Sequence, residues 1–149
     1  PDFTQLTSQI SSHLAPLRAG QTDTMKGFGA LGRAAMTAGA LDARTKELIA
    51  LAIGVAQRCD GCIGFHTKAL VQMGCSEAEL QEMLGVAVYM GGGPSLMYAA
   101  NALAAFQQFS QQAGSAQHPA WSGRKKASVR ARGSCWSCHS ARKALLRSG

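Results

Sequence analysis

Residues 46–70, KELIALAIGVAQRCDGCIGFHTKAL, decide the fold. The first half repeats apolar residues at helical spacing, and Asp42 precedes it as a candidate N-cap. Asp60 is a candidate N-cap for a second helix, which is expected to run to Gly74 because glycine is typical just after a helix C-terminus. The stretch therefore predicts two successive helices joined by a short turn.

The same kind of pattern extends in both directions from this stretch. Upstream, apolar positions repeat at helical spacing along residues 3–18, and a Gly- and Ala-rich helix is expected over about residues 23–38. Downstream, Ser76 and Glu79 form a capping-box pattern, and the run GGGP at 91–94 indicates a break before a last helix. The sequence therefore predicts an all-α compact bundle of about six helices, without strands.

Charge divides the chain into two parts. The formal net charge of the 149 residues is +7, but residues 1–112 hold seven Lys or Arg and all eight Asp or Glu, whereas residues 113–149 hold eight Lys or Arg. We therefore expect one helical domain over residues 1–112 and a basic tail over residues 113–149 that is disordered or poorly packed. The near-neutral domain argues against nucleic-acid binding by the fold itself.

Neither an export signal nor a membrane span is recognisable. The first residues lack a basic start, and the longest apolar stretch, residues 48–56, is too short to cross a bilayer. A cytoplasmic location without a membrane partner is therefore expected. In a reducing compartment the five cysteines are not expected to form structural disulfides, and a close pair is expected to be catalytic, redox-active or metal-bound.

The close pair is Cys59 and Cys62, and His66 follows one helical turn later. If Asp60 caps the helix, Cys62 lies in its first turn, where unpaired backbone N–H groups and the helix dipole favour a thiolate. Cys59 is close enough to form a disulfide across the turn, and His66 shares a helix face with Cys62 and can accept its proton. Such a pair can reduce a peroxide through a sulfenic acid and a disulfide, which an external dithiol then reduces. This cycle needs no cofactor.

The segment resembles the core of the alkylhydroperoxidase D family, within the wider carboxymuconolactone decarboxylase superfamily. The resemblance rests on the pattern E-x11-C-x2-C-x3-H, from Glu47 to His66, and extends over roughly residues 20–110. It implies an all-helical homo-trimer or homo-hexamer that reduces hydrogen peroxide or an organic hydroperoxide. By this resemblance Cys62 attacks the peroxide and Cys59 resolves the intermediate, while His66 and Glu47 join a proton relay. The implied reductant is a dithiol, which is a protein-bound lipoyl group in the best-known members.

The place of Glu47 in such a site is not explained by simple geometry. About twelve residues of straight helix span about 18 Å, and an antiparallel hairpin leaves Glu47 near its far end, away from Cys59. Two arrangements would bring the carboxylate to the site: a helix break around Gly54, or the packing of neighbouring helices or subunits. The role of Glu47 therefore follows from the resemblance alone.

Other interpretations of the cysteine pair remain open. Cys59, Cys62 and His66 supply three ligands for zinc, and a closed zinc site needs a fourth. Cys75 or Glu47 would complete it, but the helical domain lacks a second ligand pair at zinc-finger spacing. A carboxymuconolactone decarboxylase-like lyase is a second alternative, although that chemistry does not need two thiols. A non-catalytic redox module is a third.

Three further features have simpler interpretations. Cys75, just after Gly74, is expected to be a buried or incidental thiol. The glycines at 91–93 lack the residues of a phosphate-binding loop and predict a tight turn before a helix. The stretch CWSCH at 135–139 matches the spacing of a haem-attachment motif, but covalent haem of that type normally requires export, so a chance match is preferred.

Overall fold

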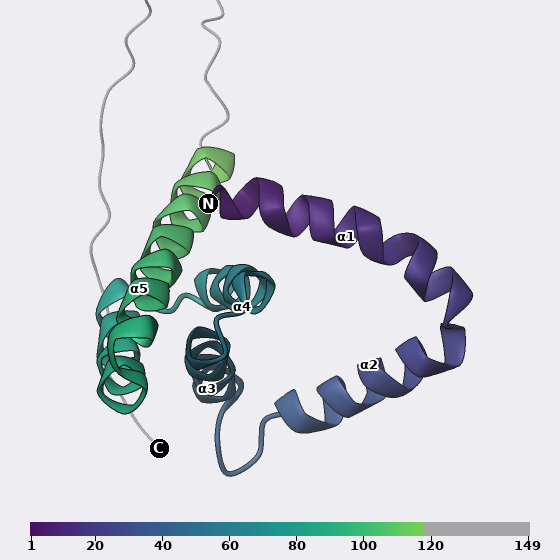
Figure 1. Ribbon diagram of the computed structural model, residues 1–149, viewed down its shortest axis with the longest axis horizontal. Coiled ribbons are helices and arrows are strands. Elements are labelled where there is room, and N and C mark those ends of the chain that lie inside the picture. Colours follow the sequence, from purple (N-terminus) through teal and green to yellow (C-terminus); the bar gives the residue numbers. More distant parts are fainter. Residues whose placement is uncertain (118–149) are drawn as a thin grey trace, which may run out of the picture. The chain divides into compact units, whose positions relative to one another are not determined.

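The computed structural model describes residues 1–117, and within them it contains five α-helices and no strand. The helices are α1 (Phe3–Gly20), α2 (Thr22–Met36), α3 (Ala43–Ala56), α4 (Asp60–Gln72) and α5 (Glu77–Gln117). Figure 1 shows α3 and α4 next to each other, with α5 packed against both. The prediction of an all-α fold is confirmed.

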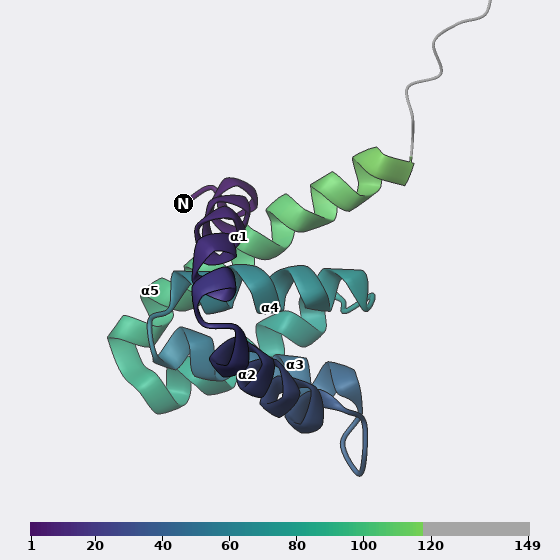
Figure 2. The same ribbon diagram turned by 90° about the vertical axis from the view of Figure 1, so that its right-hand side faces the viewer.

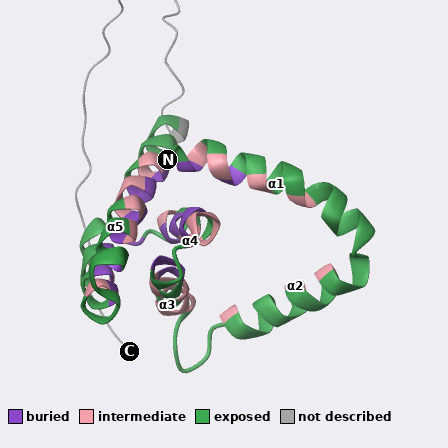
Figure 3. Ribbon diagram, viewed as in Figure 1, coloured by how far each residue is buried: buried purple, intermediate pink, exposed green. Residues whose placement is uncertain are grey.

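The core lies between α3, α4 and α5, with a contribution from the start of α1. These helices supply the fully buried Leu51, Ile63, Leu70 and Phe3. Figure 3 shows the buried residues gathered on the sides of α3, α4 and α5 that face one another. Burying one such side chain contributes about 1.5–3 kcal/mol to the stability of the folded chain, so these contacts hold the α3–α4 hairpin in place.

Three predicted helix boundaries are confirmed. The carboxylate of Asp42 caps α3 by accepting a hydrogen bond from the backbone N–H of Thr45 at 2.7 Å. Ser76 and Glu79 form the capping box of α5, with N–H donors bonded reciprocally at 2.8 and 3.2 Å. Gly74 follows α4 with a φ of 71°, the left-handed conformation in which glycine has no steric penalty.

The predicted count of about six helices is slightly off, since α5 is numbered as one element although it consists of two helical segments that meet at a kink in the predicted break. Gly92 alone is non-helical inside α5, with φ 66° and ψ −154°, and Figure 2 shows the two segments of α5 running in different directions. Pro94 lies in the first turn after the kink, where its missing N–H removes no helical hydrogen bond. The glycine run therefore separates two helical segments at the position where the sequence predicts a break.

The helix α2 is packed differently from the others, because it buries none of its residues. Phe28 and Leu31 on α2 are 71% and 66% exposed. Further exposed apolar side chains lie on α3 and α5, namely Ile49, Ile53, Val86, Tyr89, Met90, Leu96 and Met97. Exposed apolar surface of this kind is typical of sites where another molecule binds.

Nothing in the part of the chain up to Gln117 is both long and apolar enough to form a membrane-spanning helix. The helix α5 extends beyond residue 112, the predicted end of the helical domain. From residue 118 on, the predicted tail lies outside the described residues, and so does the CWSCH stretch at 135–139. The division into a domain and a tail stays a prediction.

Candidate active site

The turn between α3 and α4 is closed by two backbone hydrogen bonds. The N–H of Arg58 donates to the carbonyl of Val55 at 3.1 Å, and the N–H of Cys59 donates to the carbonyl of Gly54 at 3.0 Å. This is the Schellman arrangement, which requires a left-handed residue just after the helix. Arg58 takes that conformation with φ 59°, although glycine adopts it at lower cost. The turn brings Cys59 directly to the start of α4.

Cys59 is the N-cap of α4, with an extended backbone of φ −102° and ψ 95°. Its sulfur accepts a hydrogen bond from the backbone N–H of Cys62 at 3.2 Å. The prediction that Asp60 caps this helix is therefore wrong. Asp60 is the first residue of α4, because the Schellman turn already gives the preceding residue the extended conformation of an N-cap. Cys62 still lies in the first turn, as predicted.

Cys59 and Cys62 form a disulfide, and their Cα atoms are 5.3 Å apart. Both residues are partly exposed. The sulfurs lie at the N-terminus of α4, where the partial positive charge of the helix favours an anion. The structure therefore brings together the pair that the sequence predicted.

Gly54 allows α3 to lie close to Cys62. A Cβ atom at Gly54 would be 3.1 Å from Cβ of Cys62 and 3.7 Å from the backbone N of Ile63. The first distance is shorter than packed side chains normally allow, so an alanine would displace Cys62. Sequence analysis does not assign Gly54 to the site. One feature of the sequence could have indicated it. Glycine inside a helix is about 1 kcal/mol less stable than alanine, so its presence suggests that a neighbouring group packs too closely for a side chain.

Glu47 contacts His66 and not the cysteines. Its Oε2 lies 2.7 Å from Nδ1 of His66, and the two side chains are 13% and 32% exposed. The α3–α4 hairpin is the cause, because it places the early part of α3 beside the middle of α4. Of the two arrangements considered, the packing of neighbouring helices delivers the carboxylate, and α3 is continuous through Gly54.

The contact with Glu47 determines what His66 can do. An ionised carboxylate only accepts hydrogen bonds, so Nδ1 carries a proton and Nε2 of a neutral imidazole is left as an acceptor. His66 lies four residues after Cys62 on the same helix, and such residues share a face. A carboxylate, an imidazole and a thiol in this order can move a proton away from the thiol.

The other cysteine among the described residues is poorly suited to this chemistry. Cys75 is 6% exposed, and burial raises the pKa of its thiol, to which the Glu79 carboxylate adds. A thiol that stays protonated is a weak nucleophile, which fits the interpretation of Cys75 as a buried residue.

Within residues 1–117 no group of three or more His, Cys, Asp or Glu side chains is arranged to hold a metal ion, so the geometry gives the zinc interpretation no support.

Comparison with known families identifies the chain. The model of the carboxymuconolactone decarboxylase family matches residues 22–105, which is more than half of the chain and includes Glu47, Cys59, Cys62 and His66. The chain belongs to the carboxymuconolactone decarboxylase family. The resemblance seen in the sequence is thereby confirmed at the level of this family.

Solved structures of this family are similar to the chain. A carboxymuconolactone decarboxylase family protein from Legionella pneumophila is 55% identical with a TM-score of 0.72, covering 72% of this chain and 96% of its own. A family protein from Thermotoga maritima is 32% identical with a TM-score of 0.58, and the match covers 62% of this chain and 95% of that protein.

A relative found by sequence is also similar to the chain. An uncharacterised protein of Cupriavidus necator is 40% identical over 103 residues, which are 69% of this chain and 90% of that protein.

Proposed function

We propose that this family member is a thiol-dependent hydroperoxide reductase that cycles Cys59 and Cys62 between dithiol and disulfide. The observation that carries the proposal is the disulfide at the N-terminus of α4, with His66 one turn away and bonded to Glu47. A family protein from Thermotoga maritima has a suggested involvement in an antioxidative response, which is in line with peroxide reduction.

In the proposed cycle, Cys62 attacks the peroxide. Its thiolate sulfur bonds to one peroxide oxygen, the O–O bond breaks, and the other oxygen takes up a proton and leaves as an alcohol or as water. The thiol of Cys59 then displaces the oxygen of the sulfenic acid on Cys62, which forms the disulfide and releases water. An external dithiol exchanges with this disulfide and becomes a disulfide itself, so two electrons pass from the dithiol to the peroxide.

His66 and Glu47 act on the proton of Cys62 in this cycle. Nε2 of His66 accepts the thiol proton, and the imidazolium returns it to the departing oxygen. The carboxylate of Glu47, 2.7 Å from Nδ1, stabilises the imidazolium and keeps the ring in one orientation. General acid–base help of this kind contributes typically about 10²–10⁴-fold in rate.

The proposal is tested with cysteine variants in a coupled assay containing tert-butyl hydroperoxide and dihydrolipoamide. Cys62→Ser is expected to abolish turnover, whereas Cys59→Ser is expected to consume about one equivalent of peroxide and then stop at a sulfenic acid. Cys75→Ser is the matched control and is expected to keep full activity, because that thiol is buried. Unchanged turnover in Cys62→Ser or Cys59→Ser would contradict the proposal, as would a lactone-consuming activity that survives alkylation of both thiols.

We also propose that the protein is a homo-trimer or homo-hexamer that works in the cytoplasm with a lipoyl group or another dithiol as reductant. The exposed apolar residues of α2, among them Phe28 and Leu31, support assembly because a second copy would remove them from water. Sedimentation equilibrium measures the mass directly, and a monomeric mass at micromolar concentration would contradict the assembly. Turnover with glutathione as fast as with dihydrolipoamide would argue against a dithiol reductant.

A further inference from the structure

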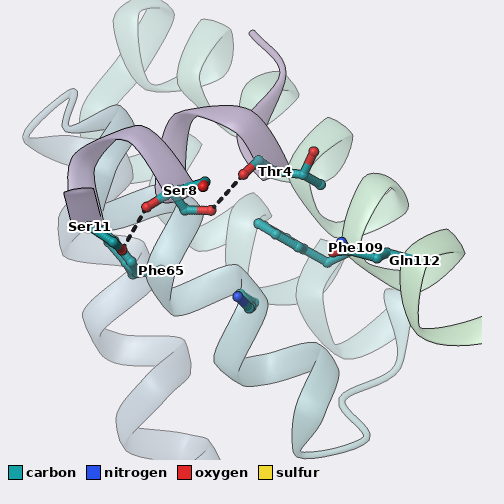
Figure 4. Close-up of a pocket in the computed structure, with 8 residues that line it drawn as sticks. Thr4, Ser8, Ser11, Phe65, Phe109 and Gln112 are labelled. Carbon is teal, nitrogen blue, oxygen red and sulfur yellow. Dashed lines mark hydrogen bonds between the residues drawn. The ribbon is translucent and has the colours of Figure 1, made fainter. Parts of the chain in front are cut away.

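A pocket of about 370 Å³ lies between α1, α4 and α5. Figure 4 shows Thr4, Ser8 and Ser11 of α1 around this pocket, together with Phe65 of α4 and with Phe109 and Gln112 of α5. Lys68 of α4 completes the lining. Three helices therefore contribute polar groups and two aromatic rings to one hollow.

Most hydroxyl groups of α1 have no hydrogen left to donate into the pocket. The hydroxyl of Thr7 donates to the carbonyl of Phe3 at 2.9 Å, and that of Ser11 donates to the carbonyl of Thr7 at 2.8 Å. The hydroxyl of Thr4 donates to the carboxylate of Asp2 at 2.7 Å. These oxygens can only accept further hydrogen bonds.

The donors that remain come from three different helices. Within the described residues, the hydroxyl of Ser8 and the side-chain amide of Gln112 make no hydrogen bond, and no carboxylate lies within ion-pair distance of Lys68. The Asp2 carboxylate is at the Thr4 end of the pocket, bonded to that hydroxyl. The pocket therefore offers an ammonium group and two neutral donors, and these groups suit the two oxygens of a carboxylate.

The pocket begins one helical turn from the redox pair. Phe65 follows Cys62 by three residues on α4, and Ser11 adjoins Ile10, whose Cδ1 would lie 3.2 Å from a Cβ atom at Gly61. Lys68 lies six residues beyond Cys62, about 9 Å along the helix axis. Cys62 does not line the pocket, so a ligand with its anion at Lys68 needs a chain of several carbons that passes Phe65 before it can reach the sulfur.

We propose that this pocket binds the carboxylate of an organic hydroperoxide, with Lys68 as the opposite charge, Ser8 and Gln112 as donors, and Phe65 in contact with the carbon chain. The substrate class is then a medium-chain carboxylic acid that bears a hydroperoxide group. This assignment rests on the proposed peroxidase function, but carboxylate binding can be measured without turnover. Lys68 acts as a specificity residue, since it stands about two turns from the sulfur that reacts.

The first experiment measures binding of octanoate to the intact protein by titration calorimetry or by NMR, with octanamide as the uncharged comparison. Octanoate is expected to bind more tightly than octanamide, and Lys68→Met is expected to weaken octanoate binding about three- to tenfold. Ser8→Ala, which leaves the charge in place, is expected to weaken it less. Lys26→Met removes an exposed lysine of α2 and is the matched control, expected to have no effect. Equal affinities in wild type and Lys68→Met, or a loss in Lys26→Met alone, would overturn the proposal.

The second experiment compares kcat/KM for a hydroperoxide of octanoic acid with that for tert-butyl hydroperoxide. Lys68→Met is expected to raise KM for the acidic substrate, leave its kcat near the wild-type value, and leave the neutral substrate unaffected. Equal losses on both substrates would overturn the role of Lys68 in specificity. Octanoate binding that depends on Lys68, without turnover of either peroxide, would instead overturn the proposed function and the substrate class derived from it.

Discussion

The α3–α4 hairpin and α2 are built from helices of similar length but are held in opposite ways. Leu51 and Val55 of α3 and Ile63 of α4 are completely buried, and the hairpin carries every residue of the candidate site. The helix α2 buries no residue, and its Phe28 and Leu31 face solvent. Figure 3 shows the contrast directly, since α2 is almost entirely exposed.

This difference indicates which contacts stabilise each of the two regions. The hairpin packs against α1 and α5 of the same chain, and these contacts position the sulfurs and His66. The apolar residues of α2 have no such cover within residues 1–117, and the proposed assembly would bury them against a second copy. The functional geometry is therefore expected to depend on the first region and the assembly on the second.

The largest contrast is expected from removing one leucine in each region. Leu51→Ala leaves a cavity in the core and is expected to lower the free energy of unfolding by about 2–5 kcal/mol. Leu31→Ala removes an exposed side chain and is expected to change it by no more than about 0.5 kcal/mol when protein is dilute. Urea denaturation followed by circular dichroism at several protein concentrations measures both. Equal losses in the dilute samples would show that the comparison is wrong.

A smaller contrast is expected from placing the same methyl group in each region. A Cβ atom at Gly64 of α4 would lie 2.6 Å from Cγ2 of Thr7, whereas one at Gly27 of α2 would meet nothing within 4 Å. Gly64→Ala is therefore expected to destabilise the protein by about 1–3 kcal/mol through overpacking against α1. Gly27→Ala is expected to stabilise it by up to about 1 kcal/mol, because alanine is the better helix former. Thermal unfolding of the two variants gives the signs, and the same sign for both would contradict the analysis.

The smallest effect concerns the caps of α3 and α2 at acid pH. The backbone N–H of Thr45 holds the pKa of the Asp42 carboxyl below its ordinary value. The ionised cap therefore stabilises α3 above about pH 4, and this contribution is lost as the pH falls through the lowered pKa. Asp42→Asn keeps an oxygen that does not titrate, so it is expected to make unfolding between about pH 4 and 2 less dependent on pH.

The matched control for the acid experiment is Gln21→Asn in α2. Gln21 makes no side-chain cap bond, so this change is expected to leave the acid profile as in the wild type. The measurement is helix content against pH by circular dichroism. If helix content falls with pH in Asp42→Asn as it does in the wild type, the Asp42 cap has no such role. The same conclusion follows if Gln21→Asn changes the pH dependence as much as Asp42→Asn does.

Local patterns in the sequence predicted the helices and most of their ends. Asp42, the Ser76–Glu79 capping box and Gly74 were found because each acts on residues within one turn of itself. The cysteine pair was found for the same reason. The cap of α4 was assigned to Asp60 instead of Cys59, because residue preferences do not reveal that Arg58 adopts a left-handed conformation.

Contacts between helices could not be predicted in this way. The bond between Glu47 and His66 depends on how α3 and α4 lie beside each other, and a distance counted along one straight helix cannot show it. The close approach of Gly54 to Cys62 is also a property of the packed hairpin. The family resemblance supplied Glu47 as a candidate because it carries information about such contacts that one sequence does not.

The sulfur of Cys59 is both a redox atom and the N-cap of α4, so a substitution at this position acts on the helix as well as on the chemistry. Cys59 and Cys62 share one helix end, and the backbone N–H of Cys62 donates a hydrogen bond to the sulfur of Cys59. Serine is a good N-cap residue, so Cys59→Ser removes the thiol and keeps a capping oxygen, whereas Cys59→Ala would remove the cap of α4 together with the thiol.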